Sequence, residues 1–332
     1  MTASPTAVVP ADAPAPAAMP PARVPRHVVL RHRAQYAVLR AVLGTLGRLG
    51  FRRASDFGAR VGLLGHHPLG VRRRVVERQI AAAFPEWDAG RVDATARAAY
   101  ENLGRTTTET AVLARFGREK ILELFDEPED WPVLERAMAR GRGVMLVAGH
   151  LGNWELAGSY FAARGLPIEA VARQMENPLF DGYLNRTRQR IGMNVIWDGD
   201  AVRRVPRALR GNGVVAFLID QGAVGLASTW VPFFGRLAKT PRGPAVFALR
   251  LQSPMVFVAP LRKPDGRFTM HLEEVVIQET GDRNADVDRI VAAYTAVLER
   301  WVRRAPEQYF WHHRRWKHQQ PNTPAELGDP LR

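Results

Sequence analysis

The feature that most constrains the fold is a series of short apolar runs that alternate with longer amphipathic segments. The runs have the length of strands and lie at 143–148, 168–172, 214–219 and 255–259. The segments between these runs show apolar residues at helical spacing, at 153–164, 178–191, 200–210 and 241–252. Continuous apolar strands that alternate with helices indicate a largely parallel sheet covered on both faces. We therefore predict an α/β fold with a central sheet flanked by helices.

The segments on either side of this core are predicted to extend it. Helical patterns precede the first run at 92–116 and 131–140, and a long helix is expected near 284–304. Phe268, Met270 and Leu272 alternate with polar residues, which is typical of an edge strand. We expect a single domain over 85–318, followed by a tail at 319–332.

The N-terminal part is different in character. Residues 1–25 contain 8 Ala and 7 Pro, which predicts a disordered leader. In 36–51 apolar residues recur at helical spacing, but Arg40 and Arg48 interrupt them, so the uncharged stretch is short for a membrane-spanning helix. We predict that 26–84 is a basic amphipathic helical region that lies on a membrane surface. The alternative is that this helix simply packs on the domain behind it.

The charge of the chain narrows the choice of partners. Lys and Arg number 47 and Asp and Glu 33, a formal net charge of +14. Residues 1–80 hold 13 Arg against Asp12, Asp56 and Glu77, so +10 of this excess is N-terminal. Nucleic acid, an anionic membrane surface and an acidic protein are the three classes of partner that such charge favours.

Several kinds of chemistry lack their sequence signatures. The chain has no cysteine, which excludes disulfides, thiolate metal sites and a cysteine nucleophile. It has no P-loop, no Gly-x-Ser-x-Gly and no His-Glu-x-x-His. Gly141-Arg-Gly143 lies at the start of a predicted strand, whereas the glycines of a dinucleotide-binding fingerprint follow a strand, so this fingerprint is absent too. We therefore expect neither a metal nor another cofactor, and no covalent intermediate on a side chain.

The segment 148–155, Ala-Gly-His-Leu-Gly-Asn-Trp-Glu, lies where the first predicted strand ends and a helix begins. Ligands bind at this edge of open α/β sheets. His150 and Glu155 could not meet within one continuous helix, since five positions turn through about 500°. If His150 sits in the turn, Glu155 in the first helical turn can reach the imidazole and orient it as a general base. The alternative is a structural histidine and a glutamate that favours the helix N-terminus.

This segment resembles the His-x-x-x-x-Glu signature of the lysophospholipid acyltransferase superfamily, in particular its lipid A branch, the Kdo2-lipid A lauroyl and myristoyl acyltransferases. Further matching blocks follow in order across about 95–318. They are Arg173 with Asn177-Pro178, Asp220-Gln221, 231–235 (VPFFG), Thr240, and 306–309 (PEQY) with 311–317 (WHHRRWK). Enzymes that acylate phosphatidylinositol mannosides share parts of the signature, which leaves the acceptor open.

The resemblance implies a glycerolphosphate-acyltransferase-like fold over 85–318 and acyl transfer at the cytoplasmic face of the inner membrane. The donor would be an acyl-carrier-protein or coenzyme A thioester, and the acceptor a hydroxyl of a lipid A precursor or another phosphorylated lipid. His150 would remove the hydroxyl proton and Glu155 would orient it. Amides near Gly149 or the side chain of Asn153 would bind the oxyanion.

The resemblance also assigns substrate contacts. Arg173 would clamp an acceptor phosphate, although an ion pair with Glu155 or Asp220 is an equal alternative. Asp220 and Gln221 would bind sugar hydroxyls or support the loop 222–238. The remaining candidates are Thr240, Arg314 and Arg315 for substrate, with Lys317, Trp311 and Trp316 beside them at a phosphate or the membrane interface, and Trp230, Phe233 and Phe234 for an acyl channel.

Two alternatives come from other functional classes. Basic patches with Tyr309, Phe310, Trp311 and Trp316 could stack bases in a nucleic-acid-binding protein, but most of the excess charge flanks the amphipathic segment, so we expect no nucleic-acid partner. A hydrolase could use the same His150 and Glu155 to activate water.

Overall fold

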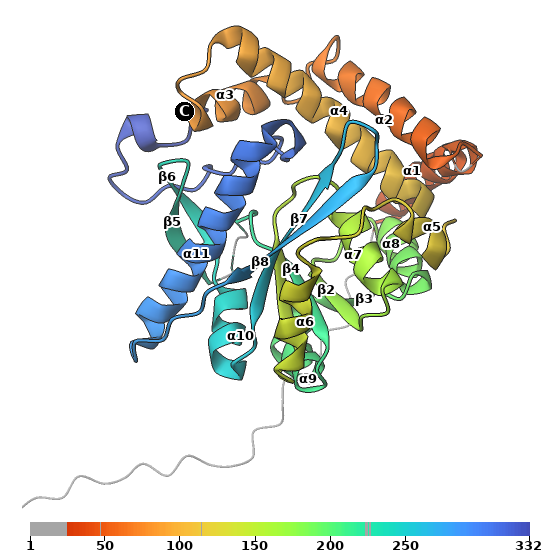
Figure 1. Ribbon diagram of the computed structural model, residues 1–332. Helices are drawn as coiled ribbons and strands as arrows, with labels where there is room; N and C mark the ends of the chain where they lie inside the picture. Colours follow the sequence, from red (N-terminus) through yellow and green to blue (C-terminus); the bar gives the residue numbers. More distant parts are fainter. Residues whose placement is uncertain (1–24, 47, 114, 223–224, 226) are drawn as a thin grey trace, which may run out of the picture.

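The computed structural model describes residues 25–46, 48–113, 115–222, 225 and 227–332 (Figure 1). The leader predicted at 1–25 lies, apart from Pro25, outside the described residues.

A six-stranded sheet in the order β3-β2-β4-β1-β7-β8 forms the centre of the fold. Its strands are β1 (Val144–Ala148), β2 (Ile168–Ala172), β3 (Asn194–Trp197), β4 (Val214–Leu218), β7 (Met255–Arg262) and β8 (Phe268–Val275). All neighbouring pairs are parallel except the last, in which β8 runs antiparallel to β7. The predicted α/β class with a largely parallel sheet is therefore confirmed.

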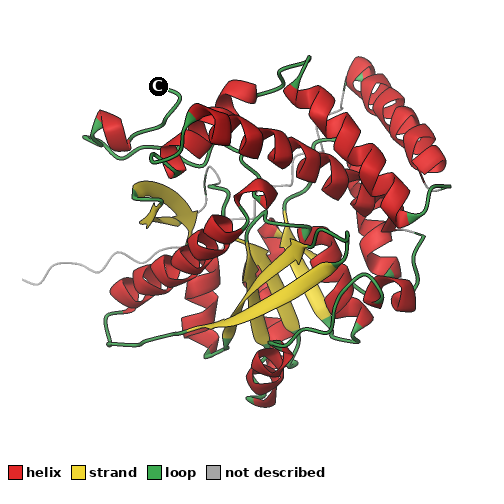
Figure 2. Cartoon of the chain, turned by 45° about the horizontal axis from the view of Figure 1, so that its top comes forward, coloured by secondary structure: helices red, strands yellow, loops and turns green. Residues whose placement is uncertain are grey.

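Helices enclose the sheet, as Figure 2 shows. They are α5 (Arg118–Leu122), α6 (Trp131–Ala139), α7 (Trp154–Ala163), α8 (Pro178–Arg190), α9 (Ala201–Arg210), α10 (Gly243–Leu251) and α11 (Arg283–Arg304). Successive strand residues point to opposite faces. Met145 and Val147 of β1 pack with α9, α10 and α11, whereas Val144 and Leu146 pack with α6 and α7. This two-sided burial explains why the strands are almost continuously apolar.

Four helices precede the sheet: α1 (Arg26–Leu46), α2 (Phe51–His66), α3 (Arg73–Ala83) and α4 (Ala89–Leu113). The backbones of α2 and α4 touch at a crossing of glycines. A Cβ atom on Gly104 would lie 2.0 Å from the carbonyl oxygen of Gly58. Another face of α2 carries the exposed apolar side chains of Phe57, Val61 and Leu64. The helix therefore packs on the domain and also keeps a free apolar stripe.

The structure corrects several expectations. The apolar pattern at 36–51 is not one helix, because α1 ends at Leu46 and α2 starts at Phe51. Within the described ranges, no helix is long and apolar enough to cross a membrane. Two pieces of β-structure were missed, β3 and the separate hairpin of β5 (Ser228–Phe233) and β6 (Arg236–Pro241). Both are short or rich in polar residues, so neither forms a continuous apolar run. The helix expected at 241–252 begins at Gly243, because Thr240 and Pro241 belong to β6.

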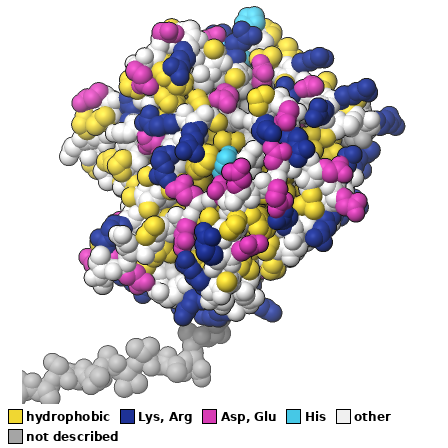
Figure 3. All heavy atoms as spheres, in the orientation of Figure 1, with side chains coloured by type: hydrophobic (Ala, Val, Ile, Leu, Met, Phe, Trp, Pro, Cys, Tyr) yellow, Lys and Arg dark blue, Asp and Glu magenta, His cyan; other side chains and the backbone are white. Residues whose placement is uncertain are grey.

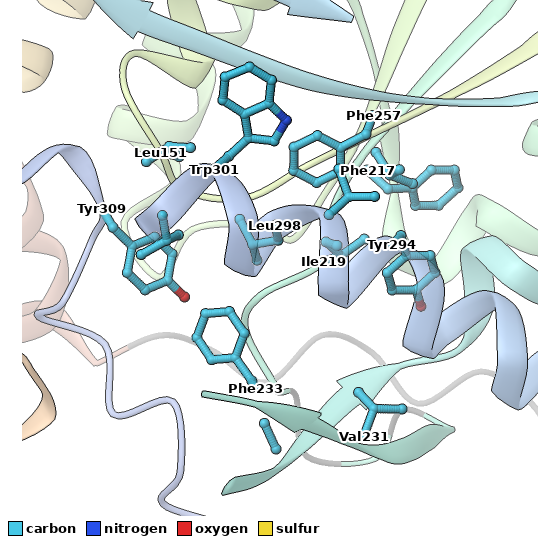
Figure 4. Close-up of a cluster of buried hydrophobic side chains, with 14 of the residues drawn as sticks. Leu151, Phe217, Ile219, Val231, Phe233, Phe257, Tyr294, Leu298, Trp301 and Tyr309 are labelled. Atoms are coloured by element: carbon cyan, nitrogen blue, oxygen red, sulfur yellow. The ribbon is translucent and has the colours of Figure 1, made fainter. Parts of the chain in front are cut away.

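The C-terminal segment is packed against the domain. Short 3-10 turns at Pro306–Gln308 and Ala325–Leu327 interrupt it. Trp311 and Trp316 are fully buried, so the expectation that they meet a membrane interface is wrong. They belong to the hydrophobic cluster that α11 shares with the sheet and with the β5–β6 hairpin. Figure 4 shows part of this cluster, with Leu298 of α11 beside Phe233 of the hairpin.

Candidate active site

His150 lies in the turn between β1 and α7, at the carboxyl edge of the sheet. Gly152 adopts a φ of +61°, and a Cβ there would lie 1.7 Å from the carbonyl oxygen of Pro260. Only glycine fits this combination of backbone angle and close approach. The carbonyl of His150 accepts a hydrogen bond from the Phe310 amide at 2.9 Å, and the Gly152 amide donates to the Gln308 carbonyl at 3.0 Å. The C-terminal segment thus holds the turn in place.

Asp220, which follows β4, is the carboxylate that holds His150. One carboxylate oxygen lies 2.7 Å from Nδ1 of the imidazole, and the other accepts the backbone amide of His150 at 2.8 Å. The side chain of Asp220 is almost fully buried. Burial on its own raises the pKa of this carboxyl, but the charge of His150, its hydrogen bonds and nearby Arg315 outweigh it and lower the pKa to about 2. Asp220 is therefore ionised at physiological pH.

Tyr309 belongs to the same cluster. Burial raises the pKa of its phenol well above the ordinary range, and the negative charge of Asp220 adds to the rise. The hydroxyl therefore stays protonated. Arg315 lies close enough to both groups for its charge to act on them, and burial lowers its own pKa. A buried carboxylate with several donors is the arrangement that keeps an ionised acid stable away from water.

The predicted contact between Glu155 and His150 is wrong. Both oxygens of Glu155 are held by Arg188 of α8, one by its Nε at 3.1 Å and the other by a short hydrogen bond from its terminal nitrogen. The spacing did place Glu155 in the first turn of α7, as expected. However, Asp220 comes from the neighbouring strand and already occupies Nδ1. Asp220, which we expected in a supporting or sugar-binding role, is the group that orients the imidazole.

A buried network from α4 supports the same turn. Asn153 caps α7 by accepting the Leu156 amide at 3.0 Å, and its own amide donates to Glu109 at 2.8 Å. Glu109 is fully buried and forms a two-point ion pair with Arg262 of β7. Asn153 is itself fully buried, so its side chain is not free to bind an oxyanion or substrate. Its role in the structure is to fix the start of α7.

Aromatic rings and an amide surround the other edge of the imidazole. The rings of Trp154 and Phe310 lie with their centroids 4.8 and 5.8 Å from that of His150. The amide nitrogen of Gln221 lies 3.3 Å from Nε2 of His150. His150 keeps a modestly exposed side chain, at 15%. The imidazole is thus oriented on one side by Asp220 and reachable on the other.

An apolar cavity of about 100 Å³ begins beside Trp154. Its walls come from β1, β2 and β4 on one side and from α7 and α8 on the other, and Glu155 and Arg188 are the charged side chains that line it within the described chain. Gly158 and Met193 lie together on this lining; a Cβ on Gly158 would come 2.6 Å from the sulfur of Met193. Because an engineered cavity of about 150 Å³ holds benzene, this cavity takes only part of a long chain unless its walls separate.

The other predicted site residues are dispersed. Arg173 is exposed and pairs with Asp198 at 3.3 Å, so neither expected ion pair, with Glu155 or with Asp220, forms. Arg314 pairs with Asp329. Thr240 is fully buried and accepts a hydrogen bond from Arg315, which also donates to the Lys239 carbonyl. Thr240 and Arg315 are therefore internal supports and do not face a bound substrate.

The predicted acyl-channel residues lie elsewhere than the cavity. Phe233 and Phe234 are buried in the cluster around Trp316 and Trp311, and Trp230 lies on the β5–β6 hairpin. None of the three lines the apolar cavity. Arg188 and Glu109 were missed by the sequence analysis. Both are ordinary charged residues in amphipathic helices, and only their burial distinguishes them.

A parallel α/β sheet with a carboxylate-held histidine at its carboxyl edge, beside an apolar cavity, is the arrangement expected of an enzyme that uses a general base on an acyl substrate. Residues 25–318 match the family described as bacterial lipid A biosynthesis acyltransferase, and the chain belongs to this family. The protein is therefore an acyltransferase, the class predicted from the sequence.

Known proteins with similar sequences are also named as acyltransferases. The chain is 27% identical over 263 residues to the lipid A biosynthesis palmitoleoyltransferase of Escherichia coli, covering 78% of this chain and 83% of the relative. It is 26% identical over 269 residues to the lauroyltransferase of the same organism, covering 81% and 86%. It is also 27% identical to a phosphatidylinositol mannoside acyltransferase of Mycobacterium tuberculosis, over 46% of this chain and 49% of the relative.

Proposed function

We propose that the protein transfers a fatty acyl chain from an acyl-carrier-protein or coenzyme A thioester to a hydroxyl of a lipid A precursor, with His150 as general base oriented by Asp220. The observation that carries this proposal is the 2.7 Å contact between Nδ1 of His150 and Asp220. A proton on Nδ1 directed at the carboxylate leaves the lone pair of Nε2 for the acceptor hydroxyl. The family and the names of its relatives favour a lipid A acceptor; another phosphorylated lysolipid or glycolipid is the alternative.

The proposed reaction needs no covalent acyl-enzyme. Nε2 of His150 takes the proton of the acceptor hydroxyl as its oxygen attacks the thioester carbonyl carbon. The tetrahedral intermediate then collapses, the carbon–sulfur bond breaks, and the thiolate receives the proton from the imidazolium. The buried Asp220 stabilises that transient cation. The amide of Gln221, which lies against Nε2 in the structure, is our candidate donor to the oxyanion once the hydroxyl takes its place at Nε2.

The apolar cavity supports a position for the acyl chain. It opens beside Trp154, whose ring packs on His150, and continues under α7 toward Gly158 and Met193. A thioester carbonyl near Nε2 would thus direct its chain into the cavity. In this arrangement Arg188 and Glu155 are positioning residues that tie α7 to α8 across the cavity.

Association with the cytoplasmic face of the inner membrane is part of the proposal. Phe57, Val61 and Leu64 lie on one face of α2 and are 44, 47 and 51% exposed. Exposed Arg53 and Arg60 flank this stripe. Apolar side chains with arginines beside them are typical of helices that lie in the headgroup layer. On the face of the molecule that Figure 3 shows, basic side chains are interleaved with acidic ones.

The membrane proposal is tested by flotation with vesicles that contain phosphatidylglycerol. Phe57→Ser combined with Leu64→Ser is expected to reduce the bound fraction. Val202→Ser combined with Val276→Ser is the matched control, since these two residues are 74 and 65% exposed outside α2. Equal binding by both double variants would contradict the role of α2.

The catalytic proposal is tested with purified enzyme, an acyl thioester and a lipid A precursor, by measuring acylated lipid, released thiol and free fatty acid separately. His150→Ala is expected to lower transfer by about 10²- to 10⁴-fold, the contribution of a positioned general base. His27→Ala, at an exposed position on α1, is the control. Wild-type turnover in His150→Ala, or release of fatty acid without acylated lipid by the native enzyme, would contradict the proposal.

A further inference from the structure

A second cavity, of about 240 Å³, lies between α1, α4 and α8. Four arginines line it: Arg40 of α1, Arg115 just after α4, and Arg186 and Arg190 of α8. Tyr183 and Gly44 are also in the wall. No carboxylate belongs to the lining that the structure describes. The cavity is therefore strongly basic.

The four charges come together only through folding. Tyr183, Arg186 and Arg190 are spaced three and four residues apart and share one face of α8. Arg188 lies on the other face, where it pairs with Glu155 beside the apolar cavity. Like charges one helical turn apart destabilise a helix. Arg186 and Arg190 therefore carry an electrostatic cost that an anion in the cavity would remove.

The helix dipoles account for only part of this charge. Most lining residues of α1, α4 and α8 lie in or near the last turn of each helix, so three C-terminal ends face the cavity. Each end carries roughly −0.5 of an elementary charge. The three helix ends together carry a charge of roughly −1.5. The guanidinium groups of Arg40, Arg186 and Arg190 carry three positive charges, so a net charge of about +1.5 remains even before Arg115 is counted. The positive charge that lines the cavity therefore exceeds the negative charge of the helix ends.

We propose that this arginine pocket binds a phosphate group, at a site separate from the reaction centre. Guanidinium groups match phosphate oxygens through paired hydrogen bonds, and several can surround one group. Tyr183 helps to hold one of them, since the guanidinium of Arg40 lies 5.6 Å from the centre of its ring. The phosphate comes either from a membrane lipid headgroup or from solution. α8 separates the pocket from the apolar cavity, so its occupant is not the acyl donor or acceptor in reaction.

Gly44 allows a test that leaves the fold intact. A Cβ at this position meets no atom within 4 Å, so a longer side chain has room. Gly44→Glu places a carboxylate at the arginines as a competing internal anion, whereas Gly44→Gln adds the same bulk without charge. Calorimetric titration with inorganic phosphate is expected to show about tenfold or greater weakening in Gly44→Glu relative to Gly44→Gln.

A second pair of variants tests the arginines themselves. Arg186→Gln combined with Arg190→Gln removes two positive charges from the pocket. Arg207→Gln combined with Arg210→Gln removes two from exposed positions on α9 and is the matched control. The pocket variant is expected to lose phosphate binding and the control to keep it. Thermal melting of the two Gly44 variants and the two arginine double variants shows whether each is folded.

Vesicles distinguish the two sources of phosphate. If the occupant is a lipid headgroup, Gly44→Glu floats less than Gly44→Gln with vesicles of one part phosphatidylglycerol to three parts phosphatidylcholine, and the difference disappears with phosphatidylcholine alone. If the occupant is free phosphate, titration separates the two variants but flotation does not. Equal phosphate affinity and equal flotation for folded Gly44→Glu, Gly44→Gln and Arg186→Gln/Arg190→Gln would overturn the proposal. Because both readouts measure binding, the result is independent of whether acyl transfer is confirmed.

Discussion

Replacing Asp220 by Asn tests which carboxylate orients His150. The native carboxylate accepts from both Nδ1 and the backbone amide of His150, at 2.7 and 2.8 Å. An asparagine can still accept the backbone amide, but its NH₂ group then faces Nδ1. The imidazole would accept that hydrogen bond through Nδ1 and carry its own proton on Nε2, where it can no longer act as a base. We expect a folded protein with the wrong tautomer.

The size of the effect has two parts. The pKa of Asp220 falls from an ordinary value near 3.8 to about 2, which corresponds to about 2 kcal/mol of favourable interaction with the ionised carboxylate, or roughly 10- to 100-fold in rate if it is lost in the transition state. The change of tautomer adds to this, since the equivalent substitution in a serine protease triad lowers kcat by about 10⁴-fold. We therefore expect kcat to fall by about 10²- to 10⁴-fold.

Glu155→Gln is the comparison. It removes the ion pair with Arg188 and leaves the contact of Asp220 with His150 in place. Its loss of kcat should be smaller than that of Asp220→Asn. Initial rates with saturating thioester and acceptor measure both, and melting temperatures report on folding.

A double-mutant cycle gives the decisive comparison. If Asp220 acts through His150, Asp220→Asn causes no further loss in the His150→Ala background. The reasoning is refuted if Asp220→Asn keeps kcat within about threefold of the native value, or if its effect persists unchanged without the imidazole. A loss in Glu155→Gln as large as that in Asp220→Asn would mean that Glu155 reaches the imidazole in the reacting enzyme.

The remaining predictions concern chain length and stability. Gly158→Leu fills the cavity beside Met193, so we expect turnover of long acyl thioesters to fall more than that of short ones, and a uniform loss across chain lengths would contradict the acyl position. Glu109→Gln leaves the Arg262 charge buried without its counterion and should lower the free energy of unfolding by about 3–5 kcal/mol in urea denaturation; Glu101→Gln on the same helix is the control. Because the pKa of Asp220 is lowered on folding, its stabilising contribution is present above about pH 5 and is lost as the pH falls through about 4 to 2. The native protein should therefore lose about 1.5 kcal/mol more than Asp220→Asn between about pH 5 and pH 2.5, and parallel losses would count against the paired carboxylate.

Local patterns predicted the secondary structure of the core well. The four apolar runs became β1, β2, β4 and β7, because strands inside a sheet covered on both faces are largely apolar. β3 and the β5–β6 hairpin were missed, since a short edge strand and a polar hairpin carry no such requirement. The same limit applied to 36–51, where helical spacing of apolar residues did not reveal the break between α1 and α2.

The sequence by itself determined the α/β class, the position of His150 after the first strand, and the resemblance to the family to which the chain belongs. These follow from periodicity and from short contiguous motifs, which are local properties. Only the tertiary structure decided which acid serves His150. Glu155 is five residues away along the chain, yet Asp220, seventy residues away, meets the imidazole because β1 and β4 are neighbours in the sheet. The same holds for the four arginines of the second cavity, which come from α1, α8 and the residues just after α4, and meet only when these parts pack together.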